Sequence, residues 1–310
     1  PMAKCLENFS NIHYYMLYYK SAKCSIMKEN FKKLDKFYTN IDVVCKCMKN
    51  IDQDKYEKII EPSVGDGSFY NLLDKDKALG IDIEPCNVSL ENKNIQKADY
   101  LTYDIESYKT RRTLVIGNPP FGKSSSLAVK FFNKSSEFAD TIAFIVPRTF
   151  RKRSIINRLN EHYHLRSETI LPPNSFHFPD GTIKNVNTVW QIWDKKRIKR
   201  KKIPQLKQFT TLWEWTDRQN ADFSIRRVGC KAGKLLTPTT ETSISSHFFI
   251  KTKHESLQEM FSNVWIKHWV TLSDNSKWDT AGNPSLTKGE LVHLLEQEFE
   301  LSQRLTNVLT

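Results

Sequence analysis

The chain has 310 residues, of which 39% are hydrophobic and 12% aromatic, so it can build one large domain with a smaller one, and global disorder is excluded. No apolar run approaches the roughly 20 residues of a membrane helix, and no secretory signal is recognisable, so we expect an intracellular protein, cytoplasmic or nuclear. The net charge is +12, and because residues 204–310 carry equal numbers of acidic and basic side chains, the whole excess lies in residues 1–203.

The N-terminal part combines a polar extension with a predicted helix. Residues 1–35 are rich in Lys, Asn and Tyr, and His13–Tyr19 is expected to be helical. A second helix is expected over Asn40–Ile51. It contains Cys45 and Cys47, which point to different helix faces, and the other four cysteines are scattered. We therefore expect reduced thiols and no metal site.

Strand-like and helix-like segments alternate over the next 140 residues. The expected strands are Lys58–Ile60, Ala78–Ile83, Asn94–Ala98, Thr113–Ile116, Thr141–Val146, Leu165–Leu171 and Asn187–Trp193. The clearest expected helices are Ser126–Ala139 and Arg151–Glu161. Alternation of this kind predicts βαβ units and an α/β fold with a mostly parallel sheet.

A basic run then precedes a segment with a different residue pattern. Lys195–Lys202 (KKRIKRKK) carries seven positive charges in eight residues. Such a run favours a polyanionic partner, nucleic acid above all; a solvated linker and a nuclear-import signal are the alternatives. Beyond it, Phe223–Ile250 is strand-rich and Gly289–Glu300 is helical. We therefore divide the chain into residues 1–35, a domain over 36–194, a basic linker over 195–203 and a second domain over 204–310.

Acidic residues and glycines follow the first three strands, where open α/β sheets bind their ligands. The first strand leads into Glu61–Phe69 (EPSVGDGSF), which has glycines at 65 and 67 that permit a tight turn, and a helix is expected after it. The second strand ends at Asp82, which is suited to the two hydroxyls of a ribose, and the third ends at Asp99. Together they predict a site for an adenosine-containing cofactor.

The fourth strand leads into Gly117–Ser124 (GNPPFGKS), which fits the spacing of a nucleoside-triphosphate phosphate loop. We reject that interpretation because Pro119 and Pro120 have no N–H for a phosphate and a fixed φ. Instead, the Asn118 side-chain oxygen and the Pro119 carbonyl can both accept from one amino group. Phe121 can stack on a planar ring. The segment therefore predicts a trap for the exocyclic amine of a base, with catalysis by positioning and electrostatics.

These motifs carry a family resemblance. Asn118–Phe121 resembles the catalytic tetrapeptide of the S-adenosylmethionine-dependent methyltransferases that act on the adenine amino group in DNA. Their cofactor loop, ribose segment, adenine segment and N-terminal cofactor motif resemble Glu61–Phe69, Gly80–Pro85, Ala98–Leu101 and Phe37–Thr39. Asn40 stands where the family often has Pro. The motif order is similar to that of the Taq-type enzymes, and the resemblance covers about residues 35–193.

The resemblance implies a class I methyltransferase Rossmann-like domain, a smaller C-terminal domain and a set of site residues. The implied catalytic residues are Asn118, Pro119, Pro120 and Phe121. The implied cofactor-binding residues are Tyr38, Thr39, Glu61, Pro62, Ser63, Gly65, Gly67, Asp82, Ile83, Asp99, Tyr100 and Asn118. A second aromatic would stack on the flipped base, for which Phe176 and Phe178 are the candidates, with a core role as the alternative; His177 between them is expected at the surface. The expected phosphate contacts are Arg148, Arg151, Lys152 and Arg153.

The expected function is methyl transfer from S-adenosylmethionine to adenine N6 in DNA, with the target base flipped out or already single-stranded. Residues 204–310 are expected to recognise the target, with Arg226 and Arg227 as readers, unless they only buttress the catalytic domain with the tryptophans as core. The same chemistry on RNA is one alternative. A protein-glutamine methyltransferase is another, disfavoured by the +12 charge and by Phe121 where such enzymes typically have Tyr. A non-catalytic subunit is disfavoured by the intact motifs.

Overall fold

The computed structural model describes residues 37–86, 94–106, 112–237, 239, 242–254, 256–264 and 279–309, with side chains described up to residue 301. The predicted helix His13–Tyr19 lies outside these residues. The chain forms two compact units, which we describe separately. Unit 1 comprises the residues up to Phe150 together with Asn157–Lys202, and unit 2 comprises Arg151–Ile156 together with the residues from Ile203 onwards.

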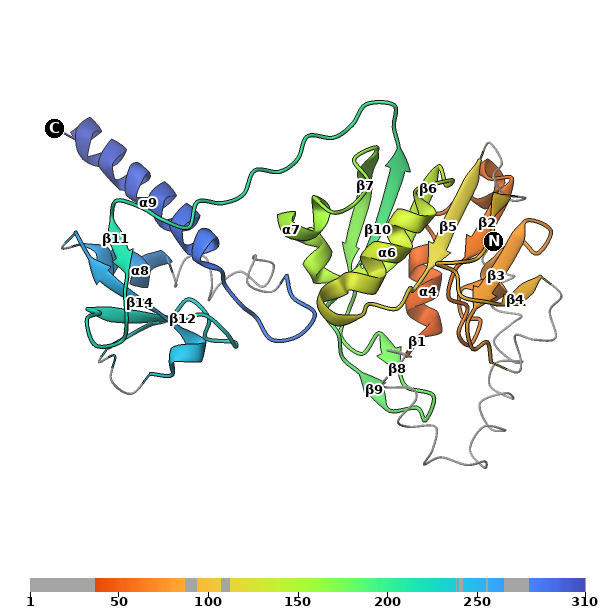
Figure 1. Ribbon diagram of the computed structural model, residues 1–310, viewed down its shortest axis with the longest axis horizontal. Coiled ribbons are helices and arrows are strands. Elements are labelled where there is room, and N and C mark those ends of the chain that lie inside the picture. The colour runs from red at the N-terminus through yellow and green to blue at the C-terminus, as the bar shows by residue number, and fades with distance from the viewer. Residues whose placement is uncertain are drawn as a thin grey trace. The chain divides into compact units, whose positions relative to one another are not determined.

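A seven-stranded sheet forms the body of unit 1, with the strand order β4-β3-β2-β5-β6-β10-β7 (Figure 1). The strands are β2 (Lys58–Glu61), β3 (Ala78–Asp82), β4 (Ile95–Lys97), β5 (Thr113–Gly117), β6 (Thr141–Pro147), β7 (Tyr163–Ile170) and β10 (Thr188–Lys195). The first five strands in this order pair in parallel, whereas β10 is antiparallel to both β6 and β7. The predicted α/β fold with a mostly parallel sheet is confirmed, and so is the smaller second domain.

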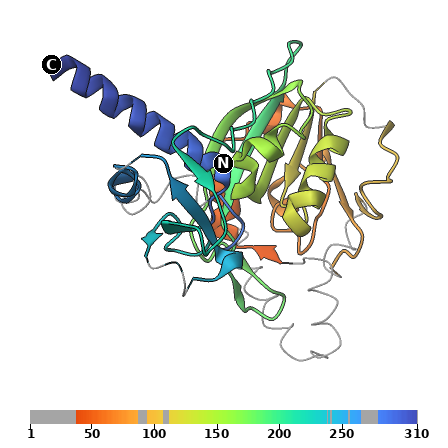
Figure 2. The same ribbon diagram turned by 60° about the vertical axis from the view of Figure 1, so that its left-hand side comes forward.

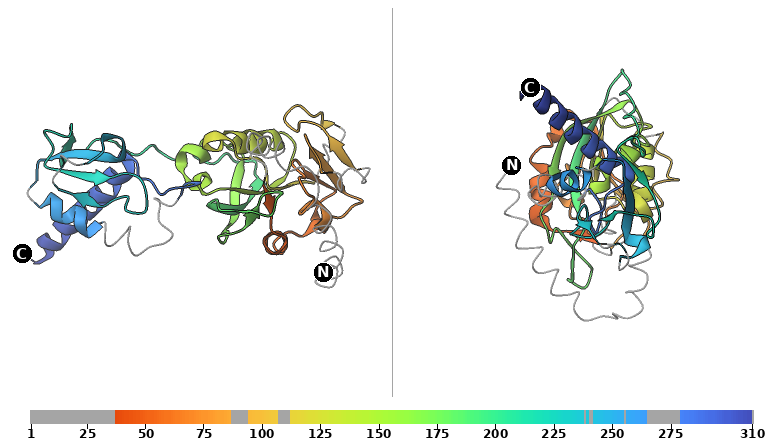
Figure 3. Two further views of the ribbon diagram at one scale, coloured as in Figure 1. Left: turned by 90° about the horizontal axis from the view of Figure 1, so that it is seen from below. Right: turned by 90° about the vertical axis from the view of Figure 1, so that its left-hand side faces the viewer.

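The central strands are buried along their whole length. Every residue of β3, β5 and β6 is buried, and each strand is a nearly continuous apolar run, as expected where both faces of a parallel sheet are covered. Helix α4 (Ile41–Met48) and helix α6 (Ser126–Ser135) lie on opposite faces of the sheet (Figure 3). The edge strand β7 is half exposed.

The strand order reverses its direction between β2 and β5. From β2 the chain first adds β3 and β4 on one side, and it then returns to add β5 and β6 on the other. Open α/β sheets bind ligands at such a switch point, outside the carboxyl ends of the two strands. The fold therefore directs attention to the loops that follow Glu61 and Gly117.

Two predicted helices are much shorter in the structure. Only a 3₁₀ turn, η3 (Tyr70–Leu72), follows the glycine loop before β3 begins at Ala78. The helix expected over Arg151–Glu161 is reduced to the 3₁₀ turn η6 (Arg148–Arg151) and the single turn α7 (Arg153–Ile156).

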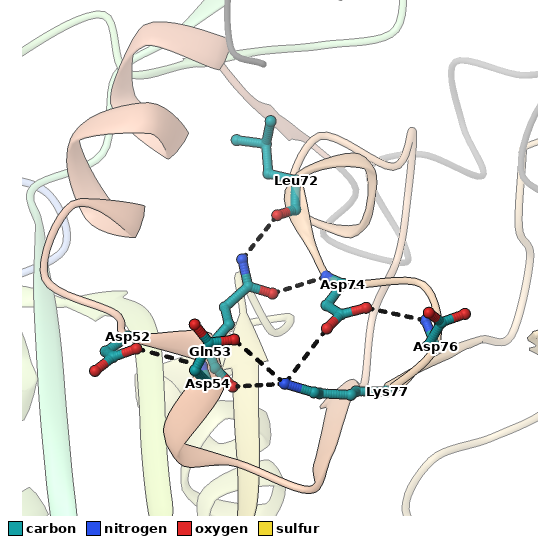
Figure 4. A network of polar contacts seen from close by, with 7 residues as sticks. All are labelled: Asp52, Gln53, Asp54, Leu72, Asp74, Asp76 and Lys77. Atoms are coloured by element: carbon teal, nitrogen blue, oxygen red, sulfur yellow. Dashed lines mark hydrogen bonds and ion pairs between the residues drawn. The ribbon is translucent and has the colours of Figure 1, made fainter. Parts of the chain in front are cut away.

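Polar contacts hold the short β2–β3 connection in place (Figure 4). The Gln53 amide, in the 3₁₀ turn η2 (Gln53–Lys55), donates to the carbonyl of Leu72 at 3.0 Å and accepts from the N–H of Asp74 at 2.8 Å. The Lys77 ammonium lies 3.5 Å from Asp54 and 3.4 Å from Asp74. These contacts anchor the segment that leads from the glycine loop to β3.

A small sheet that the sequence did not reveal joins distant parts of unit 1. Its strands are β1 (Tyr38–Thr39), β8 (Phe176–His177) and β9 (Ile183–Lys184), in the order β1-β8-β9. Tyr38 pairs with His177 and Thr39 with Phe176, in an antiparallel register. This pairing brings the N-terminal motif and the segment around Phe176 together.

Unit 2 contains an antiparallel sheet of four strands in the order β11-β14-β12-β13. The strands are β11 (Trp213–Trp215), β12 (Phe223–Arg226), β13 (Leu235–Leu236) and β14 (His247–Thr252). Helices α8 (Leu257–Val264) and α9 (Lys288–Leu309) pack on this sheet through a shared core (Figures 2 and 3). Trp213 lies within that core, whereas Trp265, Trp269 and Trp278 lie outside the described residues.

Among the described residues, no helix is both long enough and apolar enough to span a bilayer.

Candidate active site

The loops after β2 and β5 meet at the switch point of the sheet. The Ser63 hydroxyl donates to the backbone carbonyl of Asn118 at 3.0 Å. Gly117 has φ +146°, and a Cβ at that position would lie 3.2 Å from Cγ of Glu61. The absence of a side chain at Gly117 therefore lets the two loops approach closely, and this junction is the candidate active site.

The Asn118 side chain is held by one end only. Its amide nitrogen donates to the Thr39 hydroxyl at 3.1 Å, and Thr39 is buried in β1. The amide oxygen, Oδ1, is buried and has no hydrogen-bond partner within the described structure. Buried polar atoms in native proteins are nearly always paired. An amide that is fixed at its nitrogen and unsatisfied at its oxygen is a site for a ligand that donates a hydrogen bond.

The rest of the catalytic loop is fixed in place by helix α6. The carbonyl of Phe121 accepts from the N–H groups of Leu127 and Ala128 at 3.1 and 3.2 Å. Ser124 and Ser125 follow with φ of +52° and +61°, a conformation that costs free energy in non-glycine residues and that clusters at functional sites. The Phe121 ring is only 4% exposed and lies 5.3 Å from the ring of Phe37. Base stacking on Phe121, as expected from the sequence, would therefore need its neighbours to shift.

The glycine loop after β2 lies close to Tyr38 and Asp82. Gly65 has φ +56°, and a Cβ there would lie 3.2 Å from the Tyr38 ring, so the position strongly favours glycine. The N–H of Gly65 donates to one oxygen of Asp82 at 2.8 Å, and the N–H of Glu84 donates to the other at 2.8 Å. Each carboxylate oxygen keeps a further lone pair for a ligand. Ile83, next to Asp82, is 53% exposed and presents an apolar surface.

Glu61 is a buried carboxyl in an acidic surrounding. It is 1% exposed, and its Oε2 has no hydrogen-bond partner in the described structure. Burial raises the pKa of Glu61 well above its ordinary value, and the charges of Asp66 and Asp82 raise it further. The Lys75 ammonium and a backbone hydrogen bond from Tyr70 act in the opposite direction. Such a group gains most from a ligand that brings a positive charge or a strong donor.

Two groups near Glu61 were not anticipated from the sequence. Burial lowers the pKa of Lys75 to about 8, and its ammonium lies 4.0 Å from the centre of the Tyr70 ring. Burial also raises the pKa of Asp66, which accepts from the hydroxyl of Ser68 at 2.7 Å. No sequence signal marked Lys75, because it lies in a polar turn of alternating aspartates and lysines.

Asp99 and Tyr100, expected together beside a cofactor adenine, have different surroundings. Asp99 is exposed at the end of β4, where its carboxylate accepts from the N–H of Leu101 at 2.9 Å. Tyr100 is 2% exposed, packs on Phe131 and shares a hydrogen bond with Ser135 of α6 at 2.8 Å. The ring of Tyr100 belongs to the core, and the cofactor contact expected at this residue stays a prediction. Pro62 is also buried, directly after β2.

The two candidate stacking aromatics also differ. Phe176 is fully buried and packs 5.2 Å from Phe37, so its ring is part of the core in this structure. This burial agrees with the core role that the sequence left open as the alternative for Phe176. Phe178 is partly exposed, with the Lys184 ammonium 5.4 Å from its ring centre. His177 between them is partly exposed and bonds Asn40 at 2.8 Å.

The basic residues expected to contact phosphate are engaged within the protein. Arg148 is 8% exposed, in unit 1. In unit 2, Arg151 forms an ion pair with Asp279 at 2.9 Å, and Lys152 lies 3.8 Å from Glu290. Arg153 donates to the carbonyl of Pro204 at 3.2 Å. These contacts give the side chains a structural task, and we do not retain them as leading phosphate contacts.

Among the described residues, no group of three or more His, Cys, Asp or Glu side chains could hold a metal ion. The described cysteines, Cys45, Cys47, Cys86 and Cys230, are not joined in disulfides. Cys86 shares a 3.0 Å hydrogen bond with the Tyr38 hydroxyl, close to the glycine loop. Burial raises the pKa of Cys47 to about 12, as expected for an inert core thiol.

Comparison with known proteins identifies a methyltransferase-like domain. Residues 52–211 match the family of the EDM2 methyltransferase-like domain. The chain is 31% identical over 108 residues to the protein ENHANCED DOWNY MILDEW 2 of Arabidopsis thaliana, covering 33% of this chain and 8% of that protein. The chain thus matches only a small part of that relative.

Solved structures resemble the fold only distantly. One is a candidate RNA methyltransferase from Pyrococcus horikoshii, which is 18% identical, covers 57% of this chain and 91% of its own, and has a TM-score of 0.40. Another is the modification subunit of a candidate type I restriction enzyme from Vibrio vulnificus YJ016, which is 17% identical, covers 60% and 50% of the two chains, and has a TM-score of 0.42.

Proposed function

The chain belongs to the EDM2 methyltransferase-like domain family, and from this premise we propose that it transfers a methyl group from S-adenosylmethionine to the N6 amine of adenine in DNA. The single observation that carries the proposal is the Asn118 amide. Its nitrogen is bound to Thr39, and its buried oxygen lacks a partner. A primary amine on a planar base supplies the missing donor.

The cofactor site fits S-adenosylmethionine on three grounds. Asp82 has lone pairs left for two ribose hydroxyls, and the exposed side chain of Ile83 offers an apolar surface to the adenine ring. The unpartnered Oε2 of Glu61 suits the positive charge of the cofactor. The turn at Gly65 and Gly67, with φ of +56° and +84°, brings the loop backbone to Asp82, whose carboxylate accepts from the N–H of Gly65. When bound, S-adenosylmethionine supplies an electrophilic methyl group on a sulfonium.

The chain would act on the target amine by orientation. Asn118 Oδ1 and the carbonyl of Pro119 accept the two amine hydrogens, which withdraws the nitrogen lone pair from the ring and directs it at the methyl group. Methyl transfer would form a nitrogen–carbon bond as the sulfur–carbon bond of the cofactor breaks, and the methylated amine would release one proton to water. The two prolines keep both acceptors aimed, since their φ angles are fixed. Phe178, which is partly exposed, is the better candidate for stacking on the base.

A base within a duplex must leave the stack to reach such a site. The +12 charge supports a polyanionic substrate and disfavours a protein substrate. The chemistry at Asn118 would serve adenine in RNA equally well, so the choice between DNA and RNA rests on experiment.

The test is the transfer of radiolabelled methyl from S-adenosylmethionine to duplex DNA, single-stranded DNA and RNA in parallel, followed by nucleoside analysis. We expect N6-methyladenine in DNA, and no product with the variant Asn118→Ala. If only RNA is labelled, the substrate is RNA and the proposal of DNA is wrong. No label in any nucleic acid, together with measurable cofactor binding by calorimetry, would favour a binding subunit that keeps the fold. A variant Asn118→Ala with near wild-type turnover would contradict the mechanism.

A further inference from the structure

We infer that the basic run Lys195–Lys202 is a fixed strip that binds a nucleic-acid backbone away from the candidate active site. For the identity of its partner the inference rests on the proposed function, but its position follows from the fold. The run begins with the last residue of β10, and all of it belongs to unit 1.

The strip is anchored to the protein, unlike a free linker. The N–H of Lys196 donates to the carbonyl of His162 at 2.7 Å, and the N–H of Arg200 donates to that of Glu161 at 2.8 Å. Imidazole nitrogens of His162 and His164 bond the carbonyls of Lys196 and Ile198 at 3.0 and 2.8 Å. The backbone of the strip is therefore held along the start of β7.

Anchoring leaves the charged side chains facing solvent. Six of the seven basic side chains are exposed, namely Lys195, Lys196, Arg197, Lys199, Lys201 and Lys202. Arg200 is the exception, because its guanidinium donates to the carbonyl of Leu159 at 2.9 Å, and burial lowers its pKa. Within the described part of the chain, the acidic side chain that pairs with the strip is Glu161, 3.3 Å from Lys202. The result is a concentrated positive field with little internal compensation.

The strip and the catalytic loop extend from opposite ends of the strands of the sheet (Figure 1). Gly117, just before the catalytic loop, is level with Phe144 of β6, whereas Asp194, just before the strip, is level with Thr141. These levels are about 10 Å apart at 3.3 Å per residue. Because β5 and β10 run in opposite directions, the two segments diverge from there. A nucleotide held at Asn118 therefore cannot also have its own phosphate on the strip.

Nucleic acid fits the strip better than an import receptor does. Binding to phosphates needs exposed cations and no free backbone. A receptor that grips an extended peptide by its main chain would have to break the hydrogen bonds to His162, Glu161 and His164. The strip would thus hold a remote part of the polynucleotide and raise its local concentration, without reading its sequence.

The test measures binding of a labelled duplex of about 30 base pairs, roughly 100 Å long at 3.4 Å per pair, without cofactor and over a range of salt. The strip variant is Lys196→Gln, Arg197→Gln, Lys199→Gln and Lys201→Gln. Its matched control removes four other exposed lysines, with Lys46→Gln, Lys49→Gln, Lys130→Gln and Lys207→Gln. We expect the strip variant to lose at least tenfold in affinity and about three to four units of salt slope, and the control much less.

Two results would overturn the inference. The first is an equal affinity of wild type and strip variant for the duplex. This holds even if the strip variant has lost binding to an import receptor. Equal losses in the strip variant and the control would show that total charge alone matters. A second variant, His162→Ala with His164→Ala, keeps every basic charge and removes two anchors. We expect a severalfold loss of affinity, and an unchanged affinity would overturn the role of anchoring. Since no methyl transfer is measured, failure here leaves the proposed chemistry testable on its own.

Discussion

Thr39 holds the Asn118 side chain at its amide nitrogen, with 3.1 Å between Asn118 Nδ2 and Thr39 Oγ1, and leaves the amide oxygen buried and unpaired. The two residues are 79 positions apart in sequence. Thr39 thus acts through another residue, as a positioning residue that decides which end of the amide meets the substrate.

Replacing Thr39 tests this relationship. Thr39→Val keeps the shape but removes the acceptor, so the amide can rotate, and we expect kcat to fall about 10- to 100-fold, with KM for the nucleic acid changed much less. Thr39→Ser keeps the hydroxyl and should retain most of the rate. Steady-state methylation kinetics separate the two parameters. A valine variant with wild-type kcat, or a serine variant as slow as the valine variant, would contradict the assignment.

Asp82 should control cofactor affinity. Hydrogen bonds to a charged group contribute roughly 1.5–3 kcal/mol each, and Asp82 also orders the glycine loop through the N–H of Gly65. Asp82→Ala should therefore weaken S-adenosylmethionine binding at least tenfold, and Asp82→Asn should weaken it less, since one acceptor oxygen remains. Calorimetric titration measures both. An unchanged dissociation constant in a folded Asp82→Ala variant, checked by circular dichroism, would refute the ribose assignment.

We expect the ionised Glu61 carboxylate to lower the free energy of unfolding and to strengthen cofactor binding. Its pKa is raised by burial and by neighbouring carboxylates, so the folded protein binds more protons than the unfolded chain between the ordinary and the raised pKa. The free energy of unfolding therefore falls as pH rises through that window. Glu61→Gln cannot ionise, and we expect a Tm at pH 8 that is a few degrees above wild type, with the difference disappearing near pH 4.

The same substitution should weaken cofactor binding. A carboxylate at Glu61 attracts the cationic cofactor, so wild-type affinity should drop as pH falls through the raised pKa of Glu61. Above the raised pKa of Glu61, we expect Glu61→Gln to bind S-adenosylmethionine at least tenfold more weakly than wild type, and we expect it to lose most of that pH dependence. Parallel titrations from pH 5 to pH 8 test this. A variant with the wild-type pH profile would show that another group controls the affinity.

Arg227 is the better candidate of the two arginines expected to read sequence. Arg226 donates through Nε to the carbonyl of Val228 at 3.1 Å, whereas Arg227 is exposed, 5.5 Å from the Phe248 ring. Arg227→Ala should change which sites are methylated in a randomised duplex library, while turnover at saturating substrate stays within about threefold. Arg226→Ala should act mainly on the stability of unit 2. Identical site preferences in wild type and Arg227→Ala would leave unit 2 with a buttressing role.

Much of the fold was predictable, because long apolar strands leave a clear pattern. The strands Thr113–Gly117 and Thr141–Pro147 are buried along their length, and the sequence pattern predicted each to within one residue. Two-residue strands such as Tyr38–Thr39 and Phe176–His177 have no period to detect. Their pairing depends on a contact between segments that are far apart in sequence, and that contact is what places Thr39 beside the catalytic loop.

The sequence predicted the positions of the motif loops and of their main polar side chains. It did not predict which of two nearby side chains packs in the core. The glycine loop, Asp82 and Asn118 lie where the motif order indicated. Tyr100 follows Asp99 directly, yet its ring enters the core beside Phe131. Likewise Phe176 and Phe178 are two residues apart, but only Phe176 packs in the core. Which member of such a pair faces the ligand depends on packing partners that the sequence does not identify.

The pairing of β1 with β8 also sets an order of events during synthesis. Thr39 can take its place only after Phe176 has left the ribosome, since the two residues pair across 137 positions. Contacts of such long range form late in folding, because the loop they close carries a high entropy cost. A nascent chain shorter than about 180 residues has the sequence of both cofactor and catalytic loops but lacks the strand that orients the Asn118 amide. The hydrogen bond from the Asn118 amide to Thr39 is therefore expected to form only after the chain has been made as far as Phe176.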